Sequence, residues 1–301
     1  MKFEHLGMIG YGEVGKIFAA GLQSNVSGVS VWDLKFDAPA LREAQRAHAA
    51  QAGVAACGSV AELCARSDLL ISAVTASNTL AVAQTAAPHI RPGTVFLDLN
   101  SASPGTKQQA AELINAAGGR YVEAGVMTSV PPYGIRVPML LGGALAADLA
   151  AVLGAWGMEA KAVSEKLGVA SAIKMCRSVM IKGLEALVIE SYTTARAYGV
   201  EDHVLPTLAE TFPGIDWDKQ GAYFFSRVVQ HGQRRAEEMR EAANTVGEAG
   251  SGFEPVMASA IASKQQWVAD QAKQGVFRGL GKEARWQDYA DRLLAATLTK
   301  P

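Results

Sequence analysis

The stretch Met8-Ile9-Gly10-Tyr11-Gly12-Glu13-Val14-Gly15 carries a G-x-G-x-x-G pattern directly after the apolar run Leu6–Ile9. A helical pattern, Val14–Leu22, follows it. A strand, this glycine pattern and a helix in that order are typical of the first turn of a dinucleotide-binding Rossmann domain. A glycine-rich turn without a ligand is the alternative interpretation.

The three glycines have different expected roles. Gly10 permits the tight turn, Gly12 lets the backbone approach a pyrophosphate, and Gly15 allows the helix to pack closely on the strand. The helix N-terminus then offers unbonded N–H groups and the positive end of its dipole to the phosphates. We therefore expect the whole turn to bind the cofactor: Gly10, Tyr11, Gly12, Glu13, Val14 and Gly15.

Asp33 ends a second strand pattern, Val29–Asp33, about twenty residues further on. A carboxylate at this place can accept hydrogen bonds from the adenosine ribose and would repel a 2′-phosphate, which favours NAD over NADP. Lys35 could instead pair with that phosphate, so NADP stays possible. Asp33 could also be an ordinary turn-forming aspartate.

The first half of the chain alternates β-branched runs with amphipathic segments, which predicts a mostly parallel sheet with helices on both faces. Two helix starts are marked, by a capping box at Ser59–Glu62 and by Ser103 before Pro104. We place this α/β domain at residues 1–163. The expected strands are Leu6–Ile9, Val29–Trp32, Val54–Cys57, Leu69–Val74, Val95–Leu99, Tyr121–Val126 and Pro138–Leu141.

The second half, residues 164–301, has helical patterns and no strand pattern. A long segment from Glu165 to about Gly199 contains no proline. The further helices are expected around Val204–Glu210, Gln220–Val246 and Pro255–Ala272. The fold class is therefore an α/β Rossmann domain with an extended sheet, followed by an all-α C-terminal domain.

Composition narrows the class of partner. The 301 residues are 49% hydrophobic and 19% charged, which suits two globular domains with sizeable cores. The formal net charge of −1 offers no broad basic field for nucleic acid or an anionic membrane, so we expect a small-molecule ligand.

The three cysteines have no metal-ligand spacing, and an odd number cannot all pair, which fits a reducing compartment. No stretch resembles a cleaved leader or a membrane span. We expect a cytoplasmic protein with no metal site.

Lys174 lies in an apolar part of the long helix, flanked by Ile173 and Met175. The surrounding residues are apolar around nearly the whole helix circumference, so we expect this stretch to be buried. Desolvation lowers the pKa of a lysine toward neutrality, as a general acid or base requires. Ser178 lies one turn on and could bond the same substrate oxygen. A lysine extending from a helix edge to solvent is the alternative.

Four blocks in this order resemble the β-hydroxyacid dehydrogenase family, which includes 3-hydroxyisobutyrate and 6-phosphogluconate dehydrogenases. They are MIGYGEVG (Met8–Gly15), LDLNSASPGT (Leu97–Thr106), YVEAGVMTSVPPYG (Tyr121–Gly134) and GVASAIKMCRSVM (Gly168–Met180). The resemblance covers nearly the whole chain. The stretch after Lys174 is similar to a branch of the family with its own C-terminal domain.

The resemblance implies site residues and a dimer. Lys174 would exchange the hydroxyl proton of the substrate while hydride moves to or from the nicotinamide, with Ser178 in place of the family's asparagine. A homodimer through the long helix is also implied. By the same resemblance, Val74 and Thr75 would lie near the ribose, Asn100 and Ser101 near the nicotinamide, and Met127, Thr128 and Ser129 at the substrate carboxylate.

Two departures from the family pattern bear on the substrate. Met-Thr-Ser replaces the family's Ser-Gly-Gly at the carboxylate loop, so the pocket has another shape. His231 and Arg234 stand where relatives have a lysine–aspartate pair and could contact an acidic substrate or the cofactor. They could equally belong to a solvated helix face. Tyr133 and Arg136 could reach the pocket or be ordinary loop residues.

The sequence therefore predicts an NAD(P)-dependent dehydrogenase that interconverts a small hydroxy acid and the matching oxo acid. An imine reductase with the same architecture is one alternative, although such enzymes usually have another residue at the position of Lys174. A non-catalytic dinucleotide-binding protein is a second alternative. A methyltransferase would leave the lysine on the long helix unexplained.

Overall fold

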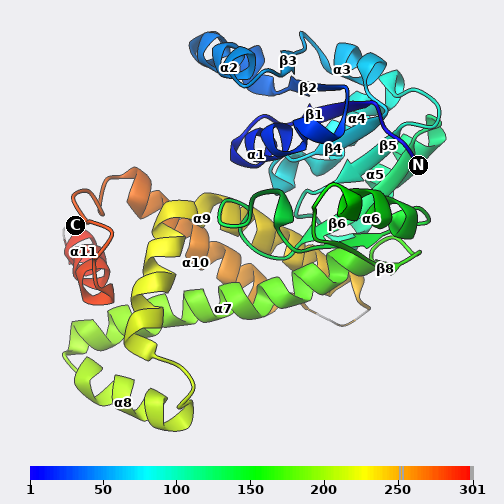
Figure 1. Ribbon diagram of the computed structural model, residues 1–301. Helices are drawn as coiled ribbons and strands as arrows, with labels where there is room; N and C mark the ends of the chain where they lie inside the picture. Colours follow the sequence, from blue (N-terminus) through cyan, green and yellow to red (C-terminus); the bar gives the residue numbers. More distant parts are fainter. Residues whose placement is uncertain (251, 253, 299–301) are drawn as a thin grey trace. The chain divides into compact units, whose positions relative to one another are not determined.

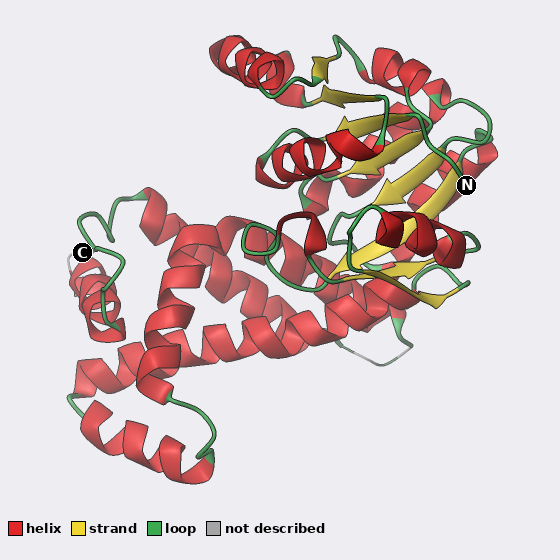
Figure 2. Ribbon diagram, viewed as in Figure 1, coloured by secondary structure: helices red, strands yellow, loops and turns green. Residues whose placement is uncertain are grey.

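The computed structural model describes residues 1–250, 252 and 254–298. The chain forms two compact units, Met1–Cys176 and Arg177–Pro301. All strands of the described residues lie in the first unit, whereas the second unit consists of helices and loops (Figure 2). The expected order of an α/β domain and an all-α domain is confirmed.

The first unit is built on one eight-stranded sheet with the order β3-β2-β1-β4-β5-β6-β7-β8. Neighbouring strands are parallel except β6 and β7, which are antiparallel. The strands are β1 (His5–Ile9), β2 (Gly28–Trp32), β3 (Ala55–Ala56), β4 (Leu69–Ser72), β5 (Val95–Asp98), β6 (Arg120–Val126), β7 (Met139–Gly142) and β8 (Ala160–Ser164). This arrangement is the predicted mostly parallel, extended sheet.

Burial on both faces explains the apolar strand sequences. Every residue of β4 and β5 is buried, because helices cover the sheet on either side (Figure 1). The α-helices of this part are α1 (Glu13–Leu22), α2 (Pro39–Gln51), α3 (Val60–Arg66), α4 (Thr79–Ala86), α5 (Pro104–Ala116) and α6 (Ala146–Ala155). Short 3-10 helices occupy Gln23–Asn25, Leu34–Phe36, Ala76–Asn78, Ala87–His89 and Gly134–Arg136.

Both predicted helix starts are confirmed. The Ser59 hydroxyl accepts the N–H of Glu62 at 3.1 Å, and the Ser103 hydroxyl accepts the N–H of Thr106 at 3.2 Å. The edge strand β8 was not predicted. Its sequence, Ala-Lys-Ala-Val-Ser, lacks a run of β-branched residues, and it pairs only with β7 at the sheet's edge.

The second unit contains most of the long helix α7 (Val169–Tyr198) together with α8 (Glu201–Thr211), α9 (Trp217–Glu248), α10 (Val256–Lys273) and α11 (Trp286–Leu298). Helices α9 and α10 pack along each other, and the core of the unit centres on Tyr192, Phe225 and Trp286. Helix α11 was not predicted. None of the helices among the described residues is both long and apolar enough to cross a membrane.

One sequence-based expectation about α7 is wrong. The stretch around Lys174, apolar around nearly the whole helix circumference, was expected to be buried, yet Ile173 is 40% exposed and Met180 is 66% exposed. Leu187 is also exposed. These three residues are seven apart and therefore share one helix face, whereas Met175 and Ser178 are buried. Only part of the helix circumference is covered.

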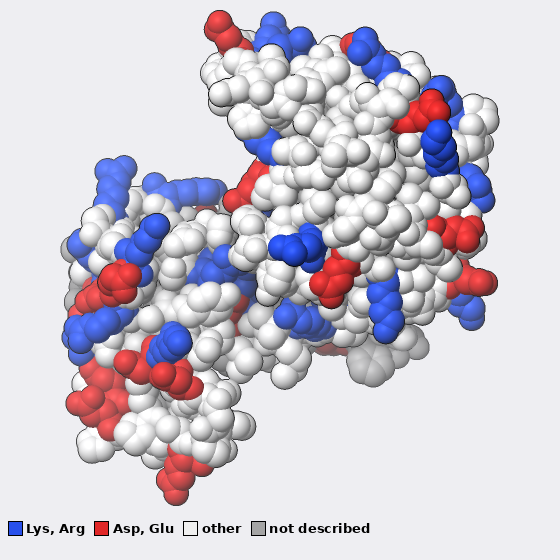
Figure 3. Space-filling model, in the orientation of Figure 1, with Lys and Arg blue, Asp and Glu red and all other residues white. Residues whose placement is uncertain are grey.

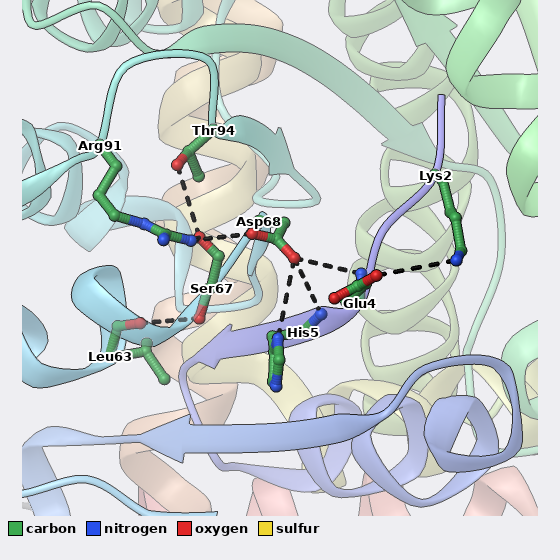
Figure 4. Close-up of polar contacts among 8 residues, drawn as sticks. All are labelled: Lys2, Glu4, His5, Leu63, Ser67, Asp68, Arg91 and Thr94. Atoms are coloured by element: carbon green, nitrogen blue, oxygen red, sulfur yellow. Dashed lines mark hydrogen bonds and ion pairs between the residues drawn. The ribbon is translucent and has the colours of Figure 1, made fainter.

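Asp68, between α3 and β4, ties together the amino ends of the strands (Figure 4). Its carboxylate accepts the backbone N–H groups of Glu4 and His5, both at 3.1 Å, and a side-chain N–H of Arg91 at 2.9 Å. Burial by itself would raise the pKa of Asp68, but these hydrogen bonds and the Arg91 charge outweigh burial and lower it.

This lowered pKa predicts an acid-dependent loss of stability. A carboxyl group with a depressed folded-state pKa stabilises the fold above its unfolded pKa, and the contribution is lost as pH falls through the folded value. We expect Asp68→Asn to lower the melting temperature at pH 6 and to reduce the further loss between pH 5 and pH 3. Calorimetry across this range, with Asp37→Asn as the exposed control, measures both. Parallel acid curves for wild type and Asp68→Asn would contradict the assignment.

Candidate active site

The predicted site residues of the first unit gather at one edge of the sheet. Strands β1, β2, β4, β5 and β6 are parallel, so the residues that follow them lie at the same carboxyl edge. The loops that leave this edge begin at Gly10, Asp33, Ala73, Leu99 and Met127. In α/β sheets this edge is where ligands bind.

The glycines of the first loop meet different constraints. Gly10 has a positive φ of 96°, and a Cβ there would lie 2.5 Å from the Ala73 carbonyl oxygen. A Cβ at Gly15 would overlap the Gly10 carbonyl oxygen. The fold itself therefore requires these two glycines.

Gly12 differs from both. Apart from its chain neighbours, the nearest heavy atom to a Cβ at Gly12 is Nζ of Lys35, 4.0 Å away. Nothing inside the protein requires glycine at this position, and its φ of −81° is ordinary. The open space in front of Gly12, at the start of α1, fits a pyrophosphate that approaches the backbone closely.

Asp33 lies directly after β2, as predicted, and holds the glycine loop. Its carboxylate accepts the N–H of Tyr11 at 2.6 Å and the N–H of Lys35 at 2.9 Å. The Tyr11 hydroxyl lies 3.0 Å from Nδ1 of His48 on α2. Asp33 therefore shapes the loop in addition to placing a negative charge beside it.

Asn100 joins the loops after β4 and β5. Its side-chain oxygen accepts the N–H of Val74 at 2.7 Å, and its side-chain nitrogen donates to the Ser72 hydroxyl at 2.9 Å. The next loop residue, Thr75, has its hydroxyl 2.8 Å from the side-chain nitrogen of Asn78. The bond between Val74 and Asn100 thus joins the two loops at the carboxyl edge, and Thr75 follows Val74 in the chain.

Beneath this loop lies a buried polar cluster around Asp98, the last residue of β5. Asp98 Oδ1 accepts the N–H of Asn100 at 2.8 Å and pairs with Nζ of Lys107 at 2.9 Å. The Tyr121 hydroxyl donates to Oδ2 at 2.6 Å. Burial, together with the Asp98 charge, raises the pKa of Tyr121 well above its ordinary value, so the phenol stays protonated and donates.

Lys174 contacts this loop. Its Nζ donates to the Ser101 hydroxyl over 2.5 Å, and its side chain is partly buried. A Cβ at Gly125 on β6 would lie 3.4 Å from Cβ of Lys174 and 2.9 Å from the Ala170 carbonyl oxygen. Glycine at position 125 therefore lets α7 pack close to β6, and Lys174 reaches the loop that follows β5.

The predicted carboxylate loop follows β6 at the same edge. The N–H of Met127 donates to the Pro138 carbonyl at 2.9 Å, which continues the β6–β7 pairing by one residue. Met127 and Ser129 are partly exposed and Thr128 is exposed. The loop is accessible to solvent, as a loop that binds a substrate must be.

Ser178, His231 and Arg234 belong to the second unit. Ser178 is buried and accepts a hydrogen bond from Nζ of Lys182 at 3.2 Å. Lys182 also pairs with Glu238 at 2.8 Å, and Arg234 lies 3.8 Å from the other oxygen of Glu238. Their proposed contacts with substrate or cofactor stay predictions.

Sequence reasoning missed four buried residues beneath the site: Asp98, Lys107, Tyr121 and Glu123. Asp98 ends an otherwise apolar strand and Glu123 lies between apolar residues of β6, a signal that the sequence does contain. Lys107 has no such signal, because a lysine on an amphipathic helix is normally exposed.

Family models match both parts of the chain. Residues 5–134 match the NAD binding domain of 6-phosphogluconate dehydrogenase, and residues 195–268 match a domain of unknown function, DUF1932. The chain is 39% identical to a conserved hypothetical protein from Sinorhizobium meliloti 1021, over 97% of this chain and 96% of that one, with a TM-score of 0.75. The chain belongs to the β-hydroxyacid dehydrogenase family.

More distant members of this fold carry different activities. A 3-hydroxyisobutyrate dehydrogenase from Mycobacterium tuberculosis is 16% identical over 97% of this chain and 99% of that one, with a TM-score of 0.64. A reductive aminase from Aspergillus terreus is 19% identical over 97% and 100%, with a TM-score of 0.56. The chain thus has the fold shared by hydroxyacid dehydrogenases and reductive aminases, and NAD(P)-linked oxidoreduction is the chemistry that its family implies.

The contrast between the glycines of this family member predicts separable effects. Because space is open at Gly12, Gly12→Ala should change the free energy of unfolding by less than about 1 kcal/mol while blocking the close approach of a pyrophosphate. Gly15→Ala should destabilise the fold, since its Cβ overlaps the Gly10 carbonyl oxygen. Urea unfolding and calorimetric titration with NAD⁺ and NADP⁺ measure the two effects. Unimpaired cofactor binding by Gly12→Ala would refute this interpretation of the loop.

Proposed function

We propose that the protein is an NAD(P)-dependent dehydrogenase that oxidises a small hydroxy acid or reduces the matching oxo acid. The hydrogen bond from Lys174 to Ser101 carries the proposal, because it brings a titratable group to the carboxyl edge of a dinucleotide-binding sheet. A lysine at this place can supply or remove the proton that alcohol–carbonyl interconversion requires.

The residues present divide this chemistry between them. Bound nicotinamide would supply or accept the hydride. In the oxidation, the substrate hydroxyl loses its proton to the neutral amine of Lys174; in the reduction, the ammonium returns it to the carbonyl oxygen. The Ser101 hydroxyl accepts a hydrogen bond from Nζ and so directs the amine at the loop after β5. The side chain of Asn100 binds that loop to the end of β4 and to the loop after it.

The proposed substrate contacts come from the loop after β6. Met127, Thr128 and Ser129 are accessible there, and hydroxyl groups can bind a carboxylate. Because this loop departs from the family's Ser-Gly-Gly, we propose a small hydroxy acid as the substrate class without choosing one. Ser178, His231 and Arg234 are proposed as contributions from the second unit.

For the cofactor, we propose NAD as the preferred form. The Asp33 carboxylate beside the glycine loop disfavours an added 2′-phosphate, whereas the ammonium of Lys35, near Gly12, would favour one. One group that repels the 2′-phosphate and one that attracts it thus lie near the glycine loop, and NADP is the alternative cofactor.

A second candidate function is the reduction of imines, because the chain shares its fold with a reductive aminase. The proton-transfer requirement is the same, since the product nitrogen needs a proton where the product oxygen would. Lys174 favours the hydroxy-acid reaction, given that imine reductases usually have another residue there. A non-catalytic dinucleotide-binding protein would bind cofactor and turn over neither class of substrate.

Thermal denaturation with NAD⁺, NADH, NADP⁺ and NADPH tests cofactor binding first. A ligand at a hundred times its Kd adds about 2.7 kcal/mol to the stability of the folded state, so the melting temperature should rise with NAD⁺ and NADH. Asp33→Asn keeps an acceptor for the Tyr11 N–H and removes the charge, so it should improve binding of NADP⁺ relative to NAD⁺. A shift with NADPH alone would overturn the NAD preference. No shift with any of the four at millimolar concentration would contradict the dehydrogenase proposal.

Turnover of hydroxy acids is then screened with the preferred cofactor. Lys174→Ala should lower kcat about 10²- to 10⁴-fold, the usual contribution of a general acid–base group, and leave cofactor binding intact. Lys166→Ala, an exposed lysine just before α7, is the matched control and should be close to wild type. Equal activity of Lys174→Ala and Lys166→Ala would remove Lys174 from the mechanism. Reduction of cyclic imines without hydroxy-acid oxidation would favour the second candidate.

We also propose a cytoplasmic homodimer. The exposed apolar residues Ile173, Met180 and Leu187 recur at intervals of seven on one face of α7, the spacing at which two helices pack along each other. Met180→Glu with Leu187→Glu should halve the mass measured by light scattering, whereas the exposed Ala197→Glu on another face should not. A monomeric wild-type protein at micromolar concentration would dismiss the dimer.

A further inference from the structure

Glu123 is a fully buried acid in the middle of β6, and the site described above leaves it without a role. Its register partner on β5 is Asp98, the carboxylate under the Asn100–Ser101 loop. Two buried acids thus lie side by side on neighbouring parallel strands. Asp98 is surrounded by donors, and the donors to Glu123 come from a different part of the chain.

Those donors belong to the start of α7. Oε1 of Glu123 accepts the N–H of Gly168 at 2.7 Å and the N–H of Ala170 at 3.1 Å. The first N–H groups of a helix have no partner inside the helix, and the positive end of the helix dipole favours an anion there. Glu123 therefore acts as an N-terminal cap for α7, supplied by a strand 45 residues away in sequence.

Two glycines make room for this contact. A Cβ at Gly142, the cross-strand partner of Glu123 on β7, would lie 2.5 Å from Oε1 of Glu123. A Cβ at Gly125 would press on the Ala170 carbonyl oxygen at 2.9 Å. Residues 123 and 125 share one face of β6, and this face receives the first turn of α7.

Lys174 lies one helical turn after Ala170. Residues four apart share a helix face, so the N–H that Glu123 holds and the side chain of Lys174 are linked by a single turn of backbone. On the other side, Asp98 holds Asn100, the neighbour of Ser101. Glu123 on β6 thus holds the helix that carries Lys174, and Asp98 on β5 holds the loop that carries Ser101. These two carboxylates are register partners on adjacent strands.

Packing alone does not account for Glu123. Its second oxygen, Oε2, is buried and has no hydrogen-bond partner among the described residues. Burying a carboxylate that has hydrogen bonds to only one of its oxygens lowers the stability of the folded state, and an apolar residue of the same size would avoid this loss. A costly buried group that fixes the element bearing a reactive side chain suggests a positioning role.

We propose that Glu123 is the positioning residue for Lys174: it fixes the first turn of α7 so that the lysine amine meets Ser101. The assignment of Lys174 as the proton carrier rests on the proposed function. The positioning itself does not, because it can be observed in the free protein without substrate or turnover.

The test measures the reactivity of the Lys174 amine. Wild type, Glu123→Met and Glu123→Gln are labelled with a trace of an amine-acylating reagent from pH 6 to pH 11, and mass spectrometry follows each lysine. Met keeps the buried volume and removes both acceptors, whereas Gln keeps an acceptor oxygen. In Glu123→Met the amine should leave Ser101 and label at least fivefold faster relative to the exposed Lys2. Glu123→Gln should stay within twofold of wild type.

A control separates positioning from general loosening. Ser59→Ala removes the cap of α3, another helix of the same unit, and should lower stability without changing the labelling of Lys174. Gly142→Ala tests the same contact without changing Glu123, because the added Cβ displaces the Glu123 carboxylate from the start of α7. It should raise Lys174 labelling as Glu123→Met does, and it decides the question if Glu123→Met does not fold.

The outcomes are distinct. Faster labelling of Lys174 in Glu123→Met or Gly142→Ala, with Glu123→Gln and Ser59→Ala unchanged, supports the proposal. Unchanged labelling in the folded variants, or an equal rise in Ser59→Ala, overturns it. Where an active substrate is in hand, Glu123→Met should also lower kcat, shift its pH profile and leave cofactor binding unchanged. If the labelling result holds but the protein proves not to be a dehydrogenase, Lys174 loses its proposed catalytic role, whereas Glu123 still positions the Lys174 amine.

Discussion

The candidate site depends on the ion pair and hydrogen bonds that the buried carboxylate of Asp98 makes. Removing two charges from water costs several kcal/mol per ion. The attraction between Asp98 and Lys107 offsets this desolvation cost only together with the further hydrogen bonds that both side chains make. Nζ of Lys107 pairs with the carboxylate and also donates to the Asp98 carbonyl oxygen, and the Tyr121 phenol donates to the second carboxylate oxygen. The strand end and α5 are thereby locked together, and the loop that carries Asn100 and Ser101 starts from a rigid point.

From that point the site extends through short polar links. Asn100 connects the loops after β4 and β5, Ser101 meets Lys174, and Glu123 holds the helix that carries Lys174. Rigid strands and capped helices therefore position each proposed reactive group, which is how preorganised sites are usually built. The charges on the outside follow no such order: on the face drawn in Figure 3, acidic and basic side chains are interspersed.

Much of the fold could be predicted because its signals are local. The strand–glycine–helix order at Leu6–Leu22, the caps at Ser59 and Ser103 and the change from alternating to helical patterns each depend on neighbours within a few residues. The edge strand β8 was missed because pairing with β7, rather than its own propensity, stabilises it. Helix α11 was not predicted although it does carry a local signal, the helical spacing of the buried residues Trp286, Tyr289, Ala290 and Leu293. The burial expected around Lys174 was wrong on the face of Ile173 and Met180, since an apolar surface alone does not say which side is covered.

The sequence by itself determined the parallel sheet, the glycine loop, the acid after β2 and the lysine of the long helix, because spacing along the chain encodes each of them. Only the tertiary structure decided what each glycine is for: the fold requires Gly10 and Gly15, and Gly12 faces open space. It alone also decided that Asp98 and Glu123 lie side by side, with Asp98 bonded to Asn100, the neighbour of Ser101, and Glu123 bonded to Ala170, one turn before Lys174. Glu123 and its donors Gly168 and Ala170 are 45 and 47 residues apart, a separation with no periodicity that one sequence can reveal, and their contact depends on how α7 packs on β6.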